Sequence, residues 1–137
     1  MTRAELIAEA RTLIGTPWQH QGRQPGIGID CAGVIVHLLR RLGIDYDVAG
    51  YSREPNGELL SHAKACLIPI ARDAYQPGDV VIFRMRSEPQ HVALITDKGM
   101  LHALGRPGPL SRVTEHGLTD QWRRQIVAAY SFPGVVD

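Results

Sequence analysis

Residues 28–43, GIDCAGVIVHLLRRLG, predict a helix that carries a cysteine in its first turn. The helix should begin at Asp30 or Cys31, because Asp is a favoured N-cap residue, and Gly43 should end it. The free N–H groups and the positive dipole end of such a turn favour a thiolate, so Cys31 is a candidate nucleophile. Gly33 leaves room for another element to approach. Apolar residues at helical spacing form the buried face: Ala32, Val34, Ile35, Leu38, Leu39 and Leu42.

The segments around this helix predict one α+β domain over residues 1–137. Thr2 and Glu5 have the spacing of a capping box for a first helix that Gly15 and Pro17 end. The Gly- and Pro-rich residues 16–29 predict an ordered loop, and residues 44–57 are irregular. Helices followed by antiparallel strands, without βαβ alternation, define the α+β class. A further helix is expected at 58–67, and strands at 80–85, 90–96, 100–104 and 125–132.

Composition excludes several classes of function, so the substrate must be inferred from the residues of a site. The formal charge of +1 gives no footprint for nucleic acid, and no apolar stretch approaches the ~20 residues of a membrane span. Two cysteines do not make a disulfide framework, so Cys31 and Cys66 are expected as free thiols. The charged N-terminal segment lacks the apolar run of a signal peptide. We therefore expect that the protein is synthesised in a bacterial cytoplasm, and that something other than its own signal sequence delivers it to any target outside the cell.

A nucleophilic thiol needs a base, and the sequence offers six histidines. His37 lies on the same helix as Cys31, about 240° around its axis, and should face away. If Asp97 and Lys98 form a two-residue loop, Ala93 lies opposite His102 on the next strand. His91 is then a diagonal neighbour of His102 on the same face, with roughly 7–8 Å between the backbones. This register predicts that His91 accepts the thiol proton and that His102 orients His91; a slip of one residue would separate them.

His62 and Cys66 form a competing pair. They are four residues apart on a predicted helix, a spacing that metal sites use. Two ligands do not complete a site, and the sequence contains neither HExxH nor CxxC. We therefore predict no metal and no cofactor.

Four motifs, taken together, resemble the NlpC-type peptidases. They are TPWQHQGRQPGIGIDCAGVI (16–35), QPGDVVIF (76–83), HVALI (91–95) and LHA (101–103). The resemblance covers about residues 4–132 and implies a papain-like α+β domain with N-terminal helices packed on an antiparallel sheet. It implies a cysteine peptidase that cleaves peptide stems of bacterial peptidoglycan, commonly next to γ-D-glutamyl residues. In the family pattern the nucleophile, base and third polar residue fall on Cys31, His91 and His102.

The resemblance also implies where the protein acts. The HQGR turn and the closing AYSFPG are most similar to the branch found in phage tails and gene transfer agents, which would place the protein in a tail tip with tail-tip partners. Two alternative hypotheses for the function remain: a non-catalytic structural tail protein, and a cysteine acyltransferase or amidase on the same scaffold.

The sequence departs from the family pattern at two positions. Ala32 stands where the family usually has Ser, which with the preceding Asp30 helps some members hold a free amino terminus. The loop lacks the family tyrosine, so Trp18 or His20 should take its place. We expect the Cys31 N–H and a donor from residues 18–20 to form the oxyanion hole. The expected substrate and oxyanion residues are thus Asp30, Trp18, His20 and Gly33.

Overall fold

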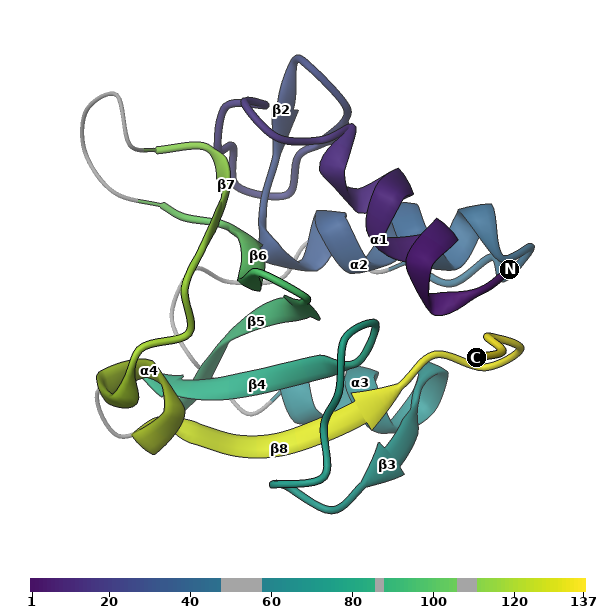
Figure 1. The fold of residues 1–137 in the computed structure, drawn as a ribbon. Coiled ribbons are helices and arrows are strands. Elements are labelled where there is room, and N and C mark those ends of the chain that lie inside the picture. Colours follow the sequence, from purple (N-terminus) through teal and green to yellow (C-terminus); the bar gives the residue numbers. More distant parts are fainter. Residues whose placement is uncertain (48–57, 86–87, 106–110) are drawn as a thin grey trace.

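The computed structural model describes residues 1–47, 58–85, 88–105 and 111–137 (Figure 1). The chain combines helices with an antiparallel sheet, which confirms the predicted α+β class. The helices are α1 (Arg3–Arg11), α2 (Cys31–Arg41), α3 (Glu58–Cys66) and α4 (Asp120–Arg124). The strands are β1 (Arg23–Gln24), β2 (Gly28–Ile29), β3 (Ile68–Ile70), β4 (Val80–Met85), β5 (Glu88–Thr96), β6 (Gly99–Ala103), β7 (Val113–His116) and β8 (Ile126–Ser131).

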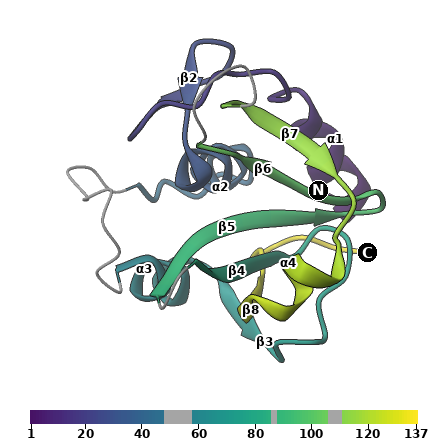
Figure 2. The same ribbon diagram turned by 90° about the vertical axis from the view of Figure 1, so that its left-hand side faces the viewer.

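Six strands form one sheet, in the order β3-β8-β4-β5-β6-β7, and every neighbouring pair is antiparallel. The strands β1 and β2 form a separate two-stranded hairpin. Figure 2 shows α2 alongside β5 and β6, and α4 close to β4 and β8. The central strand β4 pairs with β5 on one side and β8 on the other, so its backbone is satisfied within the sheet.

Apolar residues alternate along β4 and build a core on each face of the sheet. Val80 and Ile82 join the larger core, which includes residues of α1 and α2. Val81 and Phe83 join the smaller core on the other face, against which Trp122 of α4 packs. Because successive side chains of a strand point to opposite faces, a strand covered on both sides must be apolar throughout. This explains the unbroken run VVIF at the start of β4.

Several local predictions are confirmed, and others need correction. Thr2 and Glu5 form the capping box of α1, and Asp30 is the N-cap of α2. Residues 16–29, expected as a loop, also contain the β1–β2 hairpin, whose turn includes Gly26 at φ 78°. The strands β3 and β7 and the helix α4 were not predicted, because each has five residues or fewer and too little periodicity to detect. Of the irregular segment 44–57, residues 48–57 lie outside the described residues.

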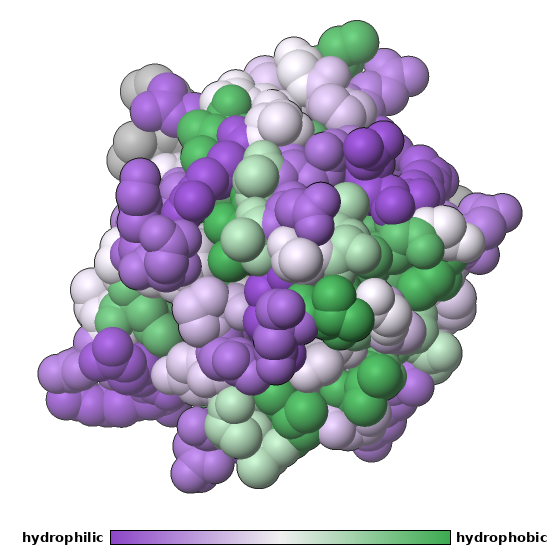
Figure 3. All heavy atoms as spheres, turned by 45° about the vertical axis from the view of Figure 1, so that its right-hand side comes forward, coloured by the Kyte–Doolittle hydropathy of each residue, from purple (hydrophilic) through white to green (hydrophobic). Residues whose placement is uncertain are grey.

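Among the described residues, few large apolar side chains are exposed. No helix among the described residues has both the length and the hydrophobicity to cross a membrane. Figure 3 shows apolar areas interspersed with hydrophilic residues on the side that carries the two termini. In the part of the chain that the structure describes, the exposed large apolar residues are Met1, Ile14, Ile27, Ile68 and Val136.

Candidate active site

Cys31 is the first residue of α2, and its position follows from the way the helix begins. The carboxylate of Asp30 accepts the N–H of Gly33 at 2.8 Å, which fixes the first turn. Cys31 is partly exposed, and its thiol interacts with the backbone N–H of Val92 in β5. Val92 directly follows His91 in the chain. The turn that begins α2 therefore brings the sulfur against the strand that carries the candidate base.

The thiol is less acidic than its place at a helix N-terminus led us to expect. Burial and the charge of Asp30 raise the pKa of Cys31 to about 11, although the N–H groups of Val92, Ala32 and Cys31 act in the opposite direction. The N–H groups at the start of α2 favour the thiolate, as predicted, but desolvation of the sulfur and the charge of Asp30 outweigh them. At neutral pH the sulfur holds its proton, and a base must remove it during the reaction.

His91 and His102 meet on the same face of the sheet. The hairpin between β5 and β6 pairs Leu94 with Leu101 and Ile95 with Met100, which confirms the predicted register. Nε2 of His91 lies 2.6 Å from Nδ1 of His102. Burial lowers the pKa of His91 to about 4, with a smaller contribution from the charge of His116. The His91 ring is therefore neutral at pH 7, the form in which one ring nitrogen is a proton acceptor.

A third histidine extends this pair and was missed in the sequence. Nε2 of His116 in β7 lies 2.8 Å from Nε2 of His102, and Nδ1 of His116 lies 2.9 Å from the Gly117 carbonyl oxygen. The ring of Trp122 lies 5.5–6.2 Å, centroid to centroid, from all three imidazoles. The signal was hidden because β7 is only four residues long and reads VTEH, with one fully buried residue.

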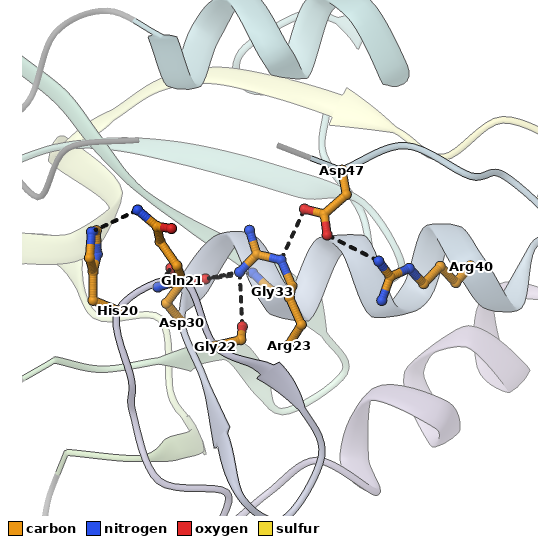
Figure 4. A network of polar contacts seen from close by, with 8 residues as sticks. All are labelled: His20, Gln21, Gly22, Arg23, Asp30, Gly33, Arg40 and Asp47. Atoms are coloured by element: carbon orange, nitrogen blue, oxygen red, sulfur yellow. Dashed lines mark hydrogen bonds and ion pairs between the residues drawn. The ribbon is translucent and has the colours of Figure 1, made fainter. Parts of the chain in front are cut away.

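The carboxylate of Asp30 accepts hydrogen bonds from other residues of the protein (Figure 4). Besides the Gly33 N–H, its carboxylate accepts the N–H of Gln21 at 2.8 Å and the guanidinium of Arg23 at 2.9 Å. Arg23 also reaches Asp47, which in turn binds Arg40. Asp30 is 4% exposed. A buried carboxylate with three donors is well suited to hold the loop against α2.

The remaining predicted substrate residues lie in the loop before α2 or pack against it. A Cβ on Gly33 would come within 2.5 Å of the Gly22 carbonyl oxygen, so the glycine permits close packing of the loop on the helix. Trp18 packs beside Gly105, and its ring centroid lies 6.5 Å from that of His20. The backbone N–H groups of Trp18 and Gln19 donate to carbonyl oxygens of Ser111 and Ile29. An oxyanion donor from residues 18–20 would therefore be a side chain or the N–H of His20.

The other histidine and cysteine candidates lie apart from this cluster. His37 contacts α1, with Nε2 3.0 Å from Oε1 of Glu9, which agrees with the prediction that it faces away from Cys31. His62 binds the Tyr46 hydroxyl, and the Cys66 thiol donates to the His62 carbonyl oxygen. Cys31 and Cys66 are both free thiols. Within the part of the chain that the structure describes, no group of three or more His, Cys, Asp or Glu side chains is placed to hold a metal ion.

The fold and the cluster define an α+β domain with a cysteine at a helix N-terminus beside histidines of an antiparallel sheet. The sequence profile of the NlpC/P60 family matches residues 15–128, and the chain belongs to this family. No curated protein matches the chain.

Solved structures share the fold at low sequence identity. The chain is 24% identical to the NlpC/p60 domain of the peptidoglycan hydrolase SagA, with a TM-score of 0.67, and the match covers 96% of this chain and 100% of that one. An NlpC/P60 family protein from Bacillus cereus is 22% identical, with a TM-score of 0.68 and 96% of this chain covered. The chain spans only 40% of that protein. NlpC1 from Trichomonas vaginalis is 17% identical, with a TM-score of 0.61, covering 95% of this chain and 43% of that one.

Proposed function

We propose that the protein is a cysteine endopeptidase that hydrolyses the peptide stems of bacterial peptidoglycan, at bonds next to γ-D-glutamyl residues. The observation that carries the proposal is the placement of the Cys31 thiol against the Val92 N–H, one residue from His91, which is hydrogen-bonded to His102. Membership of the NlpC/P60 family and the shared fold with a domain of a peptidoglycan hydrolase support the substrate class.

The reaction would be acyl transfer to water in two steps. Since Cys31 and His91 are both neutral at pH 7, proton transfer from sulfur to His91 accompanies attack of Sγ on the stem carbonyl. The resulting imidazolium protonates the leaving amine, which leaves a thioester on Cys31. Water then attacks the thioester with His91 as base, and the sulfur departs with its proton restored. His102 keeps the His91 ring in position throughout.

The negative oxygen of each tetrahedral intermediate needs donors. The backbone N–H of Cys31 is one, because it lies at the free end of α2. The second would come from Trp18 or His20, which lie in the loop that β1, β2 and Asp30 hold in place. Loss of one such donor typically raises the barrier by about 3–4 kcal/mol.

We also propose that the protein is a tail component of a phage or gene transfer agent, synthesised in the bacterial cytoplasm and carried to the cell wall by the particle. The HQGR turn and the AYSFPG segment support this assignment by their resemblance to that branch. Mass spectrometry of purified particles should detect the protein at a fixed ratio to tail-tip proteins. Its absence from particles would contradict the tail assignment without affecting the hydrolase.

The hydrolase itself is tested with purified sacculi and isolated muropeptides. Fragments identified by mass spectrometry should show cleavage after the γ-D-glutamyl residue, with one water added, and an acyl-enzyme should be trapped on Cys31. Cleavage at another bond would keep the hydrolase and correct its specificity. Transfer to an added amine in preference to water would make it an acyltransferase, and an inert protein would support a structural role.

A further inference from the structure

We propose that His116 is a positioning residue that sets the tautomers of His102 and His91, so that the lone pair of His91 is kept for the Cys31 thiol. This inference rests on the proposed function, because it concerns the base of the same site. It adds a third ring and a backbone carbonyl to the pair that the sequence predicted.

The Gly117 carbonyl oxygen can only accept a hydrogen bond. Nδ1 of His116, 2.9 Å away, must therefore carry a proton. When the His116 ring is in its neutral form, the other nitrogen has the lone pair, so Nε2 of His116 accepts across the 2.8 Å contact from Nε2–H of His102. One backbone oxygen thus fixes the proton of the middle ring.

The same rule, that a neutral imidazole has one N–H and one lone pair, determines the proton position of His91. With its proton on Nε2, His102 has a lone pair on Nδ1, which accepts from Nε2–H of His91 across 2.6 Å. His91, neutral because burial lowers its pKa to about 4, is left with its lone pair on Nδ1. That nitrogen is the one not used within the histidine chain, and we assign it as the acceptor of the thiol proton.

The opposite pattern would disable the base. If His102 carried its proton on Nδ1, it would compete with the Nε2–H of His91, and His91 would have to move its proton to Nδ1. His102 is fully buried, with 0% exposure, so water is not at hand to replace the acceptor that His116 supplies. Trp122, whose ring centroid lies 5.5 Å from that of His102, covers the chain of rings. His116 thus supplies the acceptor that matches this orientation of the chain.

Two substitutions separate this role from simple packing. His116→Phe keeps the ring but removes the acceptor, whereas His116→Gln loses the ring but keeps an acceptor, since Oε1 lies as many bonds from Cβ as Nε2 does. His37→Phe is the matched control, because His37 contacts Glu9 on α1 and belongs to no part of the site. We expect His116→Phe to lower kcat about ten-fold or more with little change in KM. His116→Gln should recover most of that loss, and His37→Phe should leave kcat unchanged.

Two further measurements need no peptidoglycan, so they remain decisive if the protein does not cut stems. The first is the ¹⁵N chemical shifts of the ring nitrogens, which should show the proton on Nδ1 of His116 and on Nε2 of His102 and His91. The second is the rate of Cys31 alkylation by iodoacetamide, which should fall in His116→Phe and recover in His116→Gln. A proton on Nε2 of His116 in the wild type would overturn the proposal, even if the variants failed to fold. Wild-type alkylation and unchanged His91 and His102 tautomers in a folded His116→Phe variant would also overturn it.

Discussion

Nε2 of His91 lies 2.6 Å from Nδ1 of His102, although eleven positions separate the two residues in the chain. The tight turn at Asp97 and Lys98 produces this contact, because it fixes the register of β5 against β6. Both rings are buried, with 9% and 0% exposure, so loss of this hydrogen bond would leave polar nitrogens with little access to water.

Replacing the nucleophile should remove activity without removing the fold. We expect Cys31→Ala to lower hydrolysis of muropeptides by about a thousand-fold or more, since the thioester can no longer form. Cys66→Ala is the matched control: its thiol donates to the His62 carbonyl oxygen, away from the histidine chain. Hydrolysis rates and thermal melting curves of both variants check this. Similar activity in the two variants would rule out Cys31 as the nucleophile.

The base and its orienting residue should respond differently to substitution. His91→Ala removes the proton acceptor and should approach the loss seen for Cys31→Ala. His102→Asn keeps a hydrogen-bonding side chain beside His91, so it should be about ten-fold more active than His102→Ala. The comparison is made in kcat at saturating substrate. Equal kcat in the two His102 variants would show that His102 does not orient the base.

The buried His91 ring should make stability depend on pH. Its pKa is about 4 in the folded protein and 6.5 in an unfolded chain, so between these values the unfolded state binds more protons. Stability should therefore fall as pH drops through this window, by about 2 kcal/mol at pH 5 relative to pH 7.5.

Urea unfolding of the wild type and His91→Gln at pH 7.5 and 5 measures this effect. The carboxylates of Asp97 and Glu115 do not interfere, because hydrogen bonds from Arg11 hold their pKa values below the ordinary range and they stay ionised at pH 5. The loss of stability should be smaller in His91→Gln. An equal loss in both proteins would mean that another group is responsible.

The engagement of Asp30 predicts weak selection for a free amino terminus. Ala32 offers no hydroxyl, and Asp30 already binds Arg23 and two backbone N–H groups. The ammonium group of a substrate would therefore lack both a hydroxyl at position 32 and a free carboxylate at Asp30. One charged hydrogen bond is worth about 1.5–3 kcal/mol, or roughly ten- to a hundred-fold in affinity. We expect kcat/KM for a free tetrapeptide to be close to that for the same stem on its disaccharide.

A pair of arginine variants tests whether Arg23 causes this lack of preference. Arg23→Gln removes the cation from Asp30 and should shift the ratio of kcat/KM values toward the free peptide. Arg40→Gln is the control, because Arg40 shares Asp47 with Arg23 but makes no contact with Asp30 in the network of Figure 4. A strong preference for the free peptide in the wild type would refute the prediction and make Asp30 an amine anchor.

Chelation should leave activity unchanged. The proposed acyl transfer uses a thiol and imidazoles alone, and His62 is engaged by the Tyr46 hydroxyl. Rates of muropeptide hydrolysis with and without EDTA check this. Inhibition that zinc reverses, and that is lost in His62→Ala, would restore the metal site considered for His62 and Cys66.

The sequence alone determined the features that depend on short stretches of chain. The capping box at Thr2 and the start of α2 at Cys31 follow from cap residues and helical spacing. The register that joins His91 to His102 follows from the length of one turn. Each of these depends on neighbours within a few residues or on one hairpin, so the pattern of residues is enough to predict them.

Only the tertiary structure decided the chemistry around these residues. The pKa of Cys31 depends on how much water the packed sheet and loop exclude, and that desolvation outweighs the hydrogen bonds from nearby backbone N–H groups. His116 joins the histidine chain because β7, short and poorly patterned, pairs with β6. Arg23 reaches Asp30 because Gly33 lets the loop lie directly on α2. Burial and contacts between distant segments set these properties, and neither is encoded in local periodicity.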